Sequence, residues 1–77
     1  NSIRQKICNF LITEYKLQKS DNIKLKMTKE KIAESLGITR PSLSRELINM
    51  QNEGLIDYSR NHIKILDLEE IENALIQ

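Results

Sequence analysis

The chain has 77 residues, with 12 lysines and arginines, 11 aspartates and glutamates, and a single cysteine. A chain of this length forms one domain with a small core, because such a domain buries only about 60% of its unfolded surface. We therefore expect a single domain over residues 1–77. The lone Cys8 excludes an internal disulfide and a thiolate metal cluster. It is better explained as a small hydrophobe on a helix face than as a redox sensor.

No apolar run reaches the roughly 20 residues that a membrane span requires, and the N-terminus lacks the apolar segment of a signal peptide. These absences favour a cytoplasmic protein without a membrane partner. The small net charge of +1 conceals an uneven distribution. Residues 1–64 carry 12 basic and 7 acidic side chains, a net charge of +5, whereas residues 65–77 carry a net charge of −4. The basic part is compatible with a nucleic-acid partner, but its charge is too modest to establish one.

The N-terminal segment predicts a helix and then a short strand. In residues 2–19 the apolar residues recur at steps of three and four, which is typical of a helix with one packing face, and Ser2 can cap this helix. Residues 23–26 alternate apolar and basic, which predicts a strand with one wet face. Lys24 and Lys26 would project outward together. They are either solvated residues that protect an edge strand, which is the simpler interpretation, or phosphate contacts.

Residues 28–56 contain two short amphipathic helical patterns joined by a glycine turn, and the rest of the chain is organised around them. Thr28 can cap the first helix, and Gly37 follows the last apolar residue of that helix, where a positive φ is favoured. Thr39 can cap the second helix, and Arg45 points away from its packing face. The apolar residues of that face fall at i, i+4 and i+7: Leu43, Leu47 and Met50. This pattern predicts a helix-turn-helix.

Two β patterns follow, at residues 55–58 and 62–65, and they predict a hairpin with a polar tip formed by Ser59, Arg60 and Asn61. A helix-turn-helix followed at once by a hairpin is a winged helix, whose wing commonly rests on the sugar-phosphate backbone. Residues 67–76 predict an acidic closing helix, capped by Asp67, with three apolar residues at helical spacing: Leu68, Ile71 and Leu75. The expected fold class is mainly α with a small β-hairpin (α+β), a winged helix-turn-helix.

The B-DNA major groove admits one α-helix, so a recognition helix over about residues 40–53 would enter it while a wing over about residues 55–65 lies on the backbone. An arginine fork matches the two acceptors of a guanine edge, so base reading is expected of Arg40, Arg45 and the neighbouring Ser44. Hydroxyl groups, cations and helix-start N–H groups suit phosphate oxygens. We expect phosphate contacts from the remaining polar residues of the unit: Thr28, Lys29, Thr39, Ser42, Arg60 and Asn61.

Simpler interpretations exist for some of these residues. The hydroxyls of Thr28 and Thr39 could serve only as helix caps, or they could do both jobs. Arg45 could form a surface salt bridge with Glu46, although the flanking pattern favours base reading.

Together these residues resemble the C-terminal DNA-binding domain of Crp/Fnr-type bacterial transcription regulators, over nearly all of the chain. The resemblance rests on the Thr-initiated helix ending in Leu36-Gly37, the Ser44-Arg45 pair with its packing stripe, and the sequence Gly54-Leu55-Ile56 that leads into the wing. It implies that Arg45 contacts guanine and that Arg40 also reads a base. It further implies phosphate contacts from Lys29 and Thr39.

Two residues depart from the family pattern. Pro41 stands where well-known members place a glutamate that accepts from cytosine, so that contact is lost and the half-site should differ. Proline is tolerated there because the first helical turn needs no intrahelical N–H donor. Ile48 lies on the outward side of the second helix, where a polar or basic residue would be unsurprising, and packing against a neighbouring element is one explanation.

The resemblance also implies partners that this chain does not contain. Family regulators carry an N-terminal β-barrel sensor and a long dimerisation helix, so we expect the chain to be an excised or truncated output domain. The intact regulator would be a homodimer on a palindromic operator of double-stranded DNA, with RNA polymerase as a further candidate partner. No cofactor is expected in this domain.

The alternative function is a winged-helix module that mediates protein or RNA contacts, because a fold does not fix a function. We do not expect an enzyme. His62 is the only histidine and has no serine or cysteine nucleophile arrangement near it in the sequence. The acidic cluster at the C-terminal end is best explained as a capped, solvated helix.

Overall fold

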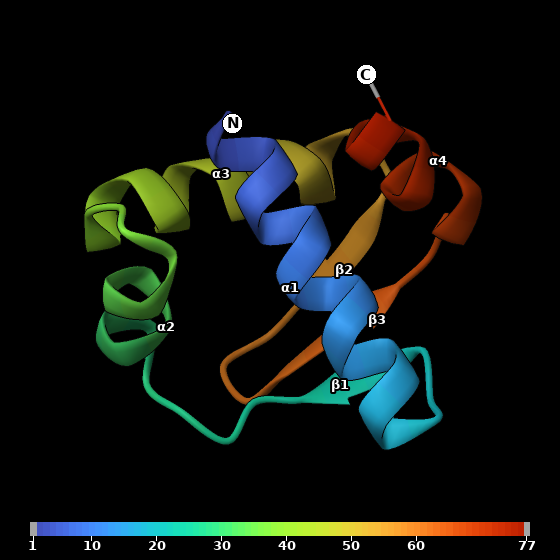
Figure 1. Ribbon diagram of the computed structural model, residues 1–77, viewed down its shortest axis with the longest axis horizontal. Helices are drawn as coiled ribbons and strands as arrows, with labels where there is room; N and C mark the ends of the chain where they lie inside the picture. The colour runs from blue at the N-terminus through green and yellow to red at the C-terminus, as the bar shows by residue number, and fades with distance from the viewer. Residues whose placement is uncertain (1, 77) are drawn as a thin grey trace.

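A computed structural model describes residues 2–76 and shows helices surrounding a small twisted sheet (Figure 1). The α-helices within this range are α1 (Ile3–Gln18), α2 (Lys29–Leu36), α3 (Arg40–Asn52) and α4 (Leu68–Asn73), and a 3₁₀ turn, η1 (Ala74–Ile76), follows α4. The strands are β1 (Asn22–Lys24), β2 (Ile56–Tyr58) and β3 (His62–Ile65). The predicted fold class, a winged helix-turn-helix that is mainly α, is confirmed.

Helix α1 begins and ends close to its predicted bounds because its caps are local. The Ser2 hydroxyl accepts a hydrogen bond from the Gln5 N–H at 3.0 Å, and the Gln5 side chain accepts from the Ser2 N–H at 3.0 Å. This reciprocal capping box satisfies two otherwise unpaired donors at the helix start. The helix ends at Lys19, which adopts a left-handed conformation with φ of 53°.

The sheet is larger than the predicted hairpin because β1 joins it. Strand β3 lies in the centre, with β1 and β2 antiparallel on its two sides, so that Ile63 stands opposite both Ile23 and Tyr58. The Leu25 N–H also donates to the Asn61 carbonyl at 2.8 Å, although Leu25 and Lys26 lie beyond the end of β1, which makes the strand shorter than predicted. The tip of the wing is therefore tied to the segment that leads into α2.

Strand β2 begins one residue later than predicted. The Leu55 N–H donates to the Met50 carbonyl at 3.0 Å and closes the end of α3, while Gly54 adopts a φ of 77°. This arrangement is the hydrogen bonding expected where a helix ends on a left-handed glycine. Leu55 is thus part of the helix terminus rather than of the strand.

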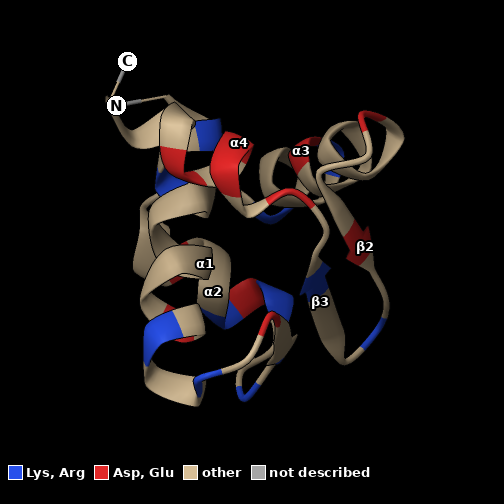
Figure 2. Cartoon of the chain, turned by 90° about the vertical axis from the view of Figure 1, so that its right-hand side faces the viewer, with Lys and Arg blue, Asp and Glu red and all other residues tan. Residues whose placement is uncertain are grey.

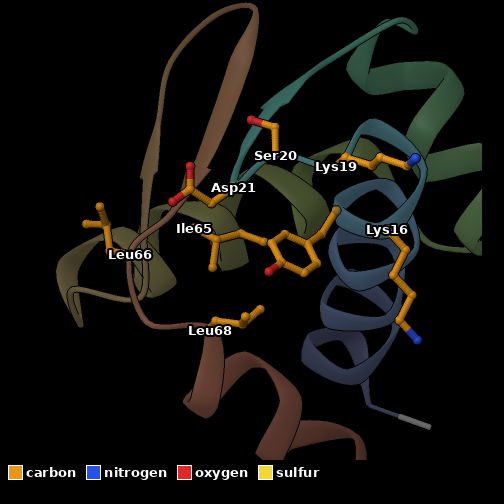
Figure 3. A pocket seen from close by; sticks show the side chains of 8 residues that line it. Lys16, Lys19, Ser20, Asp21, Ile65, Leu66 and Leu68 are labelled. Atoms are coloured by element: carbon orange, nitrogen blue, oxygen red, sulfur yellow. The ribbon is translucent and has the colours of Figure 1, made fainter.

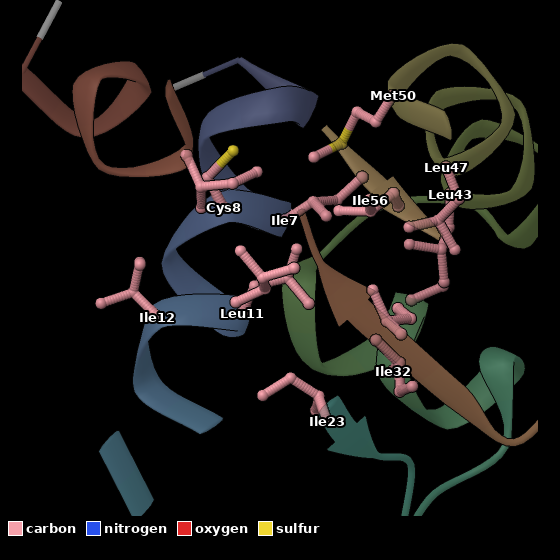
Figure 4. Close-up of a cluster of buried hydrophobic side chains, with 14 residues drawn as sticks. Ile7, Cys8, Leu11, Ile12, Ile23, Ile32, Leu43, Leu47, Met50 and Ile56 are labelled. Atoms are coloured by element: carbon pink, nitrogen blue, oxygen red, sulfur yellow. The ribbon is translucent and has the colours of Figure 1, made fainter. Parts of the chain in front are cut away.

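One continuous core joins all of these elements (Figure 4). Helices α1 and α3 and the inner face of the sheet contribute most of its side chains, and Cys8 is among them, as predicted for a small hydrophobe. The buried residues are Ile7, Cys8, Leu11, Ile12, Ile23, Ile32, Ala33, Leu43, Leu47, Met50, Ile56, Ile63, Ile65 and Ile71. Because this core is formed within the chain, the helix-turn-helix is held in place by α1 and the sheet behind it.

The C-terminal helix is shorter than predicted. The regular α-helix ends at Asn73, and the next residues tighten into η1. Asp67 caps α4 as expected, since its carboxylate accepts from the Glu70 N–H at 3.1 Å, and Ile71 is buried. Leu75 is exposed although it stands at helical spacing from Ile71, because a 3₁₀ turn has about 3.0 residues per turn and rotates it away from the core. Among the described helices none is long and apolar enough to cross a membrane.

Candidate nucleic-acid interface

Helices α2 and α3 are capped as the sequence predicts. The Thr28 hydroxyl accepts from the Lys31 N–H at 3.2 Å, and the Thr39 hydroxyl accepts from the Ser42 N–H at the same distance. Between the two helices Gly37 adopts a φ of 70°, and its N–H donates to the carbonyls of Ala33 and Glu34. The turn therefore fixes the direction in which α3 leaves α2 (Figure 1). Both threonines act as caps, which leaves any contact with phosphate a prediction.

Helix α3 has a buried side and an exposed side. Leu43, Leu47 and Met50 are at most 2% exposed and hold the helix against α1 and the sheet. On the other side Arg45 is exposed, and Ser44 is half-buried beside it. Ile48 is 49% exposed, so the explanation that it packs against a neighbouring element is wrong.

Arg45 makes no ion pair or side-chain hydrogen bond with any other described residue. The salt bridge with Glu46 that the sequence allows is not formed, because Glu46 is paired with Arg4 of α1 instead. The Arg45 fork is therefore unoccupied by other groups of residues 2–76. An unpaired guanidinium can donate its parallel N–H groups to a base edge or to a phosphate without first breaking an ion pair.

Arg4 connects α1 with Glu46 of α3 and with Glu53, the C-cap residue that follows this helix. Its Nε donates to Glu46, and its two terminal nitrogens donate to the two carboxylate oxygens of Glu53 at 2.8 and 2.6 Å. The hydrogen bonds that Arg4 donates to Glu53 hold the pKa of this carboxylate below its usual range, and the same bonds raise the pKa of Arg4. Both carboxylates are thus turned toward α1 rather than toward the exposed side of α3.

A groove of about 460 Å³ lies between the wing tip and the starts of α2 and α3. Four basic residues line it, together with the cap of α2 and the tip of the wing: Lys26, Lys29, Arg40, Arg60, Thr28 and Asn61. Lys29 lies with its Nζ 4.5 Å from the centre of the Tyr58 ring, a cation–π contact that joins the start of α2 to β2. Arg40 is only loosely held by Glu30, with 3.9 Å between charged atoms and both side chains more than half exposed.

A family model for the Crp-like helix-turn-helix domain matches residues 5–74. The chain belongs to this family. A transcriptional regulator of the crp/fnr family from Eubacterium rectale is 34% identical to it, with a TM-score of 0.88 over 100% of this chain and 35% of that protein.

Two further structures share the fold of this Crp-like domain. The CO-dependent transcription factor CooA from Carboxydothermus hydrogenoformans has 20% identity and a TM-score of 0.81, over 94% of this chain and 36% of its own. FixK2 from Bradyrhizobium japonicum has 18% identity and a TM-score of 0.84, over 95% of this chain and 38% of its own. No match was found among curated proteins. The chain therefore spans about a third of the structures that it resembles, and its family supports a DNA-binding domain of a transcription regulator.

The structure divides the predicted site residues of this Crp-like domain into two groups. Five of them gather around the groove: Thr28, Lys29, Arg40, Arg60 and Asn61. The other group lies on α3 outside that groove, with Ser44 and Arg45 on the exposed side and Thr39 and Ser42 joined at the cap, where the Thr39 hydroxyl donates to the Ser42 oxygen at 2.9 Å. Arg40 thus lies with candidates for phosphate binding, whereas the other candidates for base reading lie outside the groove.

One cation that lines the groove, and the aromatic ring that contacts Lys29, are not among the site residues that the sequence predicts. Lys26 was best explained as an edge-strand residue, yet it lies beyond β1 and lines the groove with Arg60. The sequence predicts Tyr58 only as a strand residue, whereas in the structure its ring contacts the Lys29 cation. The alternation of residues 23–26 contained the signal for Lys26, whereas no local pattern points to Tyr58. In Figure 2 the acidic α4 lies at the opposite end of the molecule from the wing tip, so it does not oppose an anion in the groove.

A second hollow, of about 600 Å³, lies between the end of α1 and the segment that connects β3 with α4 (Figure 3). Its one carboxylate, Asp21, is paired with Lys64 at 3.3 Å. The described residues contain no group of three or more histidine, cysteine or acidic side chains placed to hold a metal ion. Burial raises the pKa of the Cys8 thiol to about 11, which makes it a poor nucleophile.

Proposed function

We propose that this domain binds double-stranded DNA in a sequence-specific manner and serves as the output domain of a transcription regulator, with α3 in the major groove and the wing on the backbone. The observation that carries the proposal is the exposed, unpaired Arg45 on the outer side of a helix whose other side is fixed in the core. A helix in the major groove presents such a residue to base edges. The basic groove beside it suits the neighbouring backbone.

Arg45 is the residue that we assign to guanine. Its guanidinium can donate two parallel hydrogen bonds to the O6 and N7 acceptors, and no described side chain has to be displaced first. Ser44 stands next to it as a shorter hydrogen-bonding group. Arg40 would read a base only after losing its weak contact with Glu30. We therefore assign it to either a base or a phosphate. Pro41 offers no acceptor to a cytosine.

The groove is the surface that we assign to the phosphate backbone. Lys29, Arg40 and Arg60 approach it from three different elements, and Lys26 adds a fourth cation. Thr28, Thr39 and Ser42 are engaged in capping, but the open N–H groups at a helix start and its positive dipole end still attract a phosphate. Asn61 completes the contact from the wing tip. These groups would fix the register of α3 on the duplex.

The partners of the intact regulator are inferred from its longer relatives, of which this chain covers only about a third. Because the chain spans about a third of those proteins, we infer an attached sensor and a homodimer that presents two copies of α3 to a palindromic operator. RNA polymerase is a further partner of such an output domain in the cytoplasm. No cofactor is assigned to the domain itself, and an isolated copy should bind a single half-site weakly because it lacks the effective concentration that a dimer supplies.

The test is a selection from random duplexes, followed by binding titrations with Arg45→Lys and Arg45→Ala. Lysine keeps the charge but loses the fork, so both variants should lose discrimination at one base pair, at a cost of about 1–3 kcal/mol on the selected duplex and little on a scrambled one. Lys16→Ala, an exposed cation at the far end of α1, is the matched control and should change neither value. The proposal is wrong if no duplex is enriched. Enrichment of an RNA or of a protein partner instead would support the alternative winged-helix function.

A further inference from the structure

Ile48 is a large apolar side chain on the otherwise polar exposed side of α3. It is 49% exposed, and the other large exposed apolar residues of the described chain lie outside this helix. The core positions of α3 are filled by its buried residues, and Ile48 is not among the residues that form the core or pack against it. Leaving such a side chain in water forgoes the favourable free energy that its burial would release. A ligand that binds this side of α3 would therefore gain from an apolar contact with Ile48.

The position of Ile48 on the helix relates it to Arg45. Residues three apart lie on the same side of an α-helix, separated by about 4.5 Å along the axis. Successive bases of one DNA strand are about 3.4 Å apart, so a helix that places Arg45 on a guanine would bring Ile48 close to an adjacent base pair. Pro41 and Asn52 are exposed on the same side, one at each end of α3. Arg45 and Ile48 therefore both lie on the exposed side of α3, between Pro41 and Asn52.

We propose that Ile48 is a specificity-determining residue that contacts the C5-methyl group of a thymine next to the guanine read by Arg45. This inference rests on the proposed function and deepens it. The thymine methyl group is the one apolar group on base edges in the major groove, and an apolar side chain recognises it by excluding water. Isoleucine is branched at Cβ and has a restricted χ1, so it presents a defined surface to that group.

The surroundings of Ile48 fit a nucleic acid better than an apolar protein partner. Its neighbours on the exposed side are Arg45 and Asn49, and the adjoining groove is basic. A protein-docking patch would need several adjacent apolar residues, whereas this one stands among a cation and an amide. Because a DNA duplex is negatively charged and the adjoining groove is basic, we assign the surface around Ile48 to DNA.

The test replaces thymines of the selected duplex one at a time by deoxyuridine, which removes the methyl group and leaves base pairing intact. At one position the wild-type domain should lose about fourfold in affinity, the factor that corresponds to one buried methyl group. Ile48→Ala should bind the thymine duplex more weakly and bind both duplexes equally. Leu17→Ala removes a more exposed apolar side chain, at 72%, from the end of α1 and should keep the full sensitivity.

The outcomes separate this inference from the proposed function. If a duplex is selected but no deoxyuridine weakens the wild type, or if Ile48→Ala keeps the same sensitivity at the same position, Ile48 does not read the methyl group although the domain binds DNA. If no duplex is selected, both proposals are overturned. Thermal unfolding of Ile48→Ala should match that of the wild type, because the side chain is outside the core.

Discussion

Replacing Lys29 with alanine tests whether the groove beside α3 holds the DNA backbone. Lys29 lines that groove, and its Nζ lies 4.5 Å from the centre of the Tyr58 ring, so the ring holds the cation at the start of α2. A protein that neutralises one phosphate releases counterions, and the slope of log K against log salt changes by about 0.9 for each such contact on B-DNA. We expect Lys29→Ala to reduce the slope by about that amount.

The magnitude can be stated for a practical range of salt. Between about 50 and 200 mM, a slope difference of about 0.9 makes the variant lose roughly three- to fourfold less affinity than the wild type. The measurement is a set of binding titrations at four or more salt concentrations, on both a selected and a scrambled duplex. Because a phosphate carries no sequence information, the preference between the two duplexes should remain the same.

Two further variants make the assay specific. Lys29→Arg keeps a cation that can stack on the ring of Tyr58, so it should retain the wild-type slope. Lys16→Ala removes an exposed charge beside the other hollow and should leave both slope and affinity unchanged. An unchanged slope in Lys29→Ala would refute the assignment of the groove to the backbone. A change in sequence preference instead would mean that Lys29 contacts a base.

The remaining predictions concern the turn and the Arg4 contacts. Gly37→Ala should lower the free energy of unfolding by about 1–2 kcal/mol and Tm by several degrees, because φ of 70° is unfavourable for a residue with a Cβ although that Cβ would meet no atom within 4 Å. Gly54→Ala, with φ of 77° and the same open space, should behave alike in thermal unfolding, and a much larger loss at Gly37 would contradict the reasoning. Since Arg4 lowers the pKa of Glu53, this carboxylate stabilises the fold above its unfolded pKa of about 4.5, and that contribution is lost as the pH falls through the lowered value. Urea unfolding between pH 3 and 6 should therefore show a weaker acid dependence for Arg4→Met, and equal dependence would exclude this role.

The sequence predicted the parts of the fold that depend on near neighbours. Thr28, Gly37 and Thr39 were found because a cap or a left-handed residue acts within a few positions of itself. The buried side of α3 followed from its helical period. The pairing of β1 with β3 did not, because the two strands lie about 40 residues apart and a short alternating pattern does not name its partner.

The candidate site was predictable in its residues but not in its arrangement. The arginines, lysines and hydroxyls of the helix-turn-helix could be named from the chemistry of base edges and phosphates. Their division between a groove and the exposed side of α3 depends on the wing tip, which is held to Leu25 by a backbone hydrogen bond. For Ile48 the sequence could not decide between packing and exposure, because that depends on whether a neighbouring element reaches it.

The contacts of Arg4 explain how a domain with a modest charge can present a cationic face. Glu46 follows Arg45 directly in the sequence, but consecutive residues are turned by about 100° around an α-helix, so Glu46 faces α1 while Arg45 faces outward. A carboxylate beside a phosphate would oppose binding by like-charge repulsion. Arg4, which lies 42 positions before Glu46 and 49 before Glu53, holds both carboxylates on the α1 side. Four of the 12 cations line the groove that we assign to the backbone of a duplex, and neither Glu46 nor Glu53 is among the residues that line it.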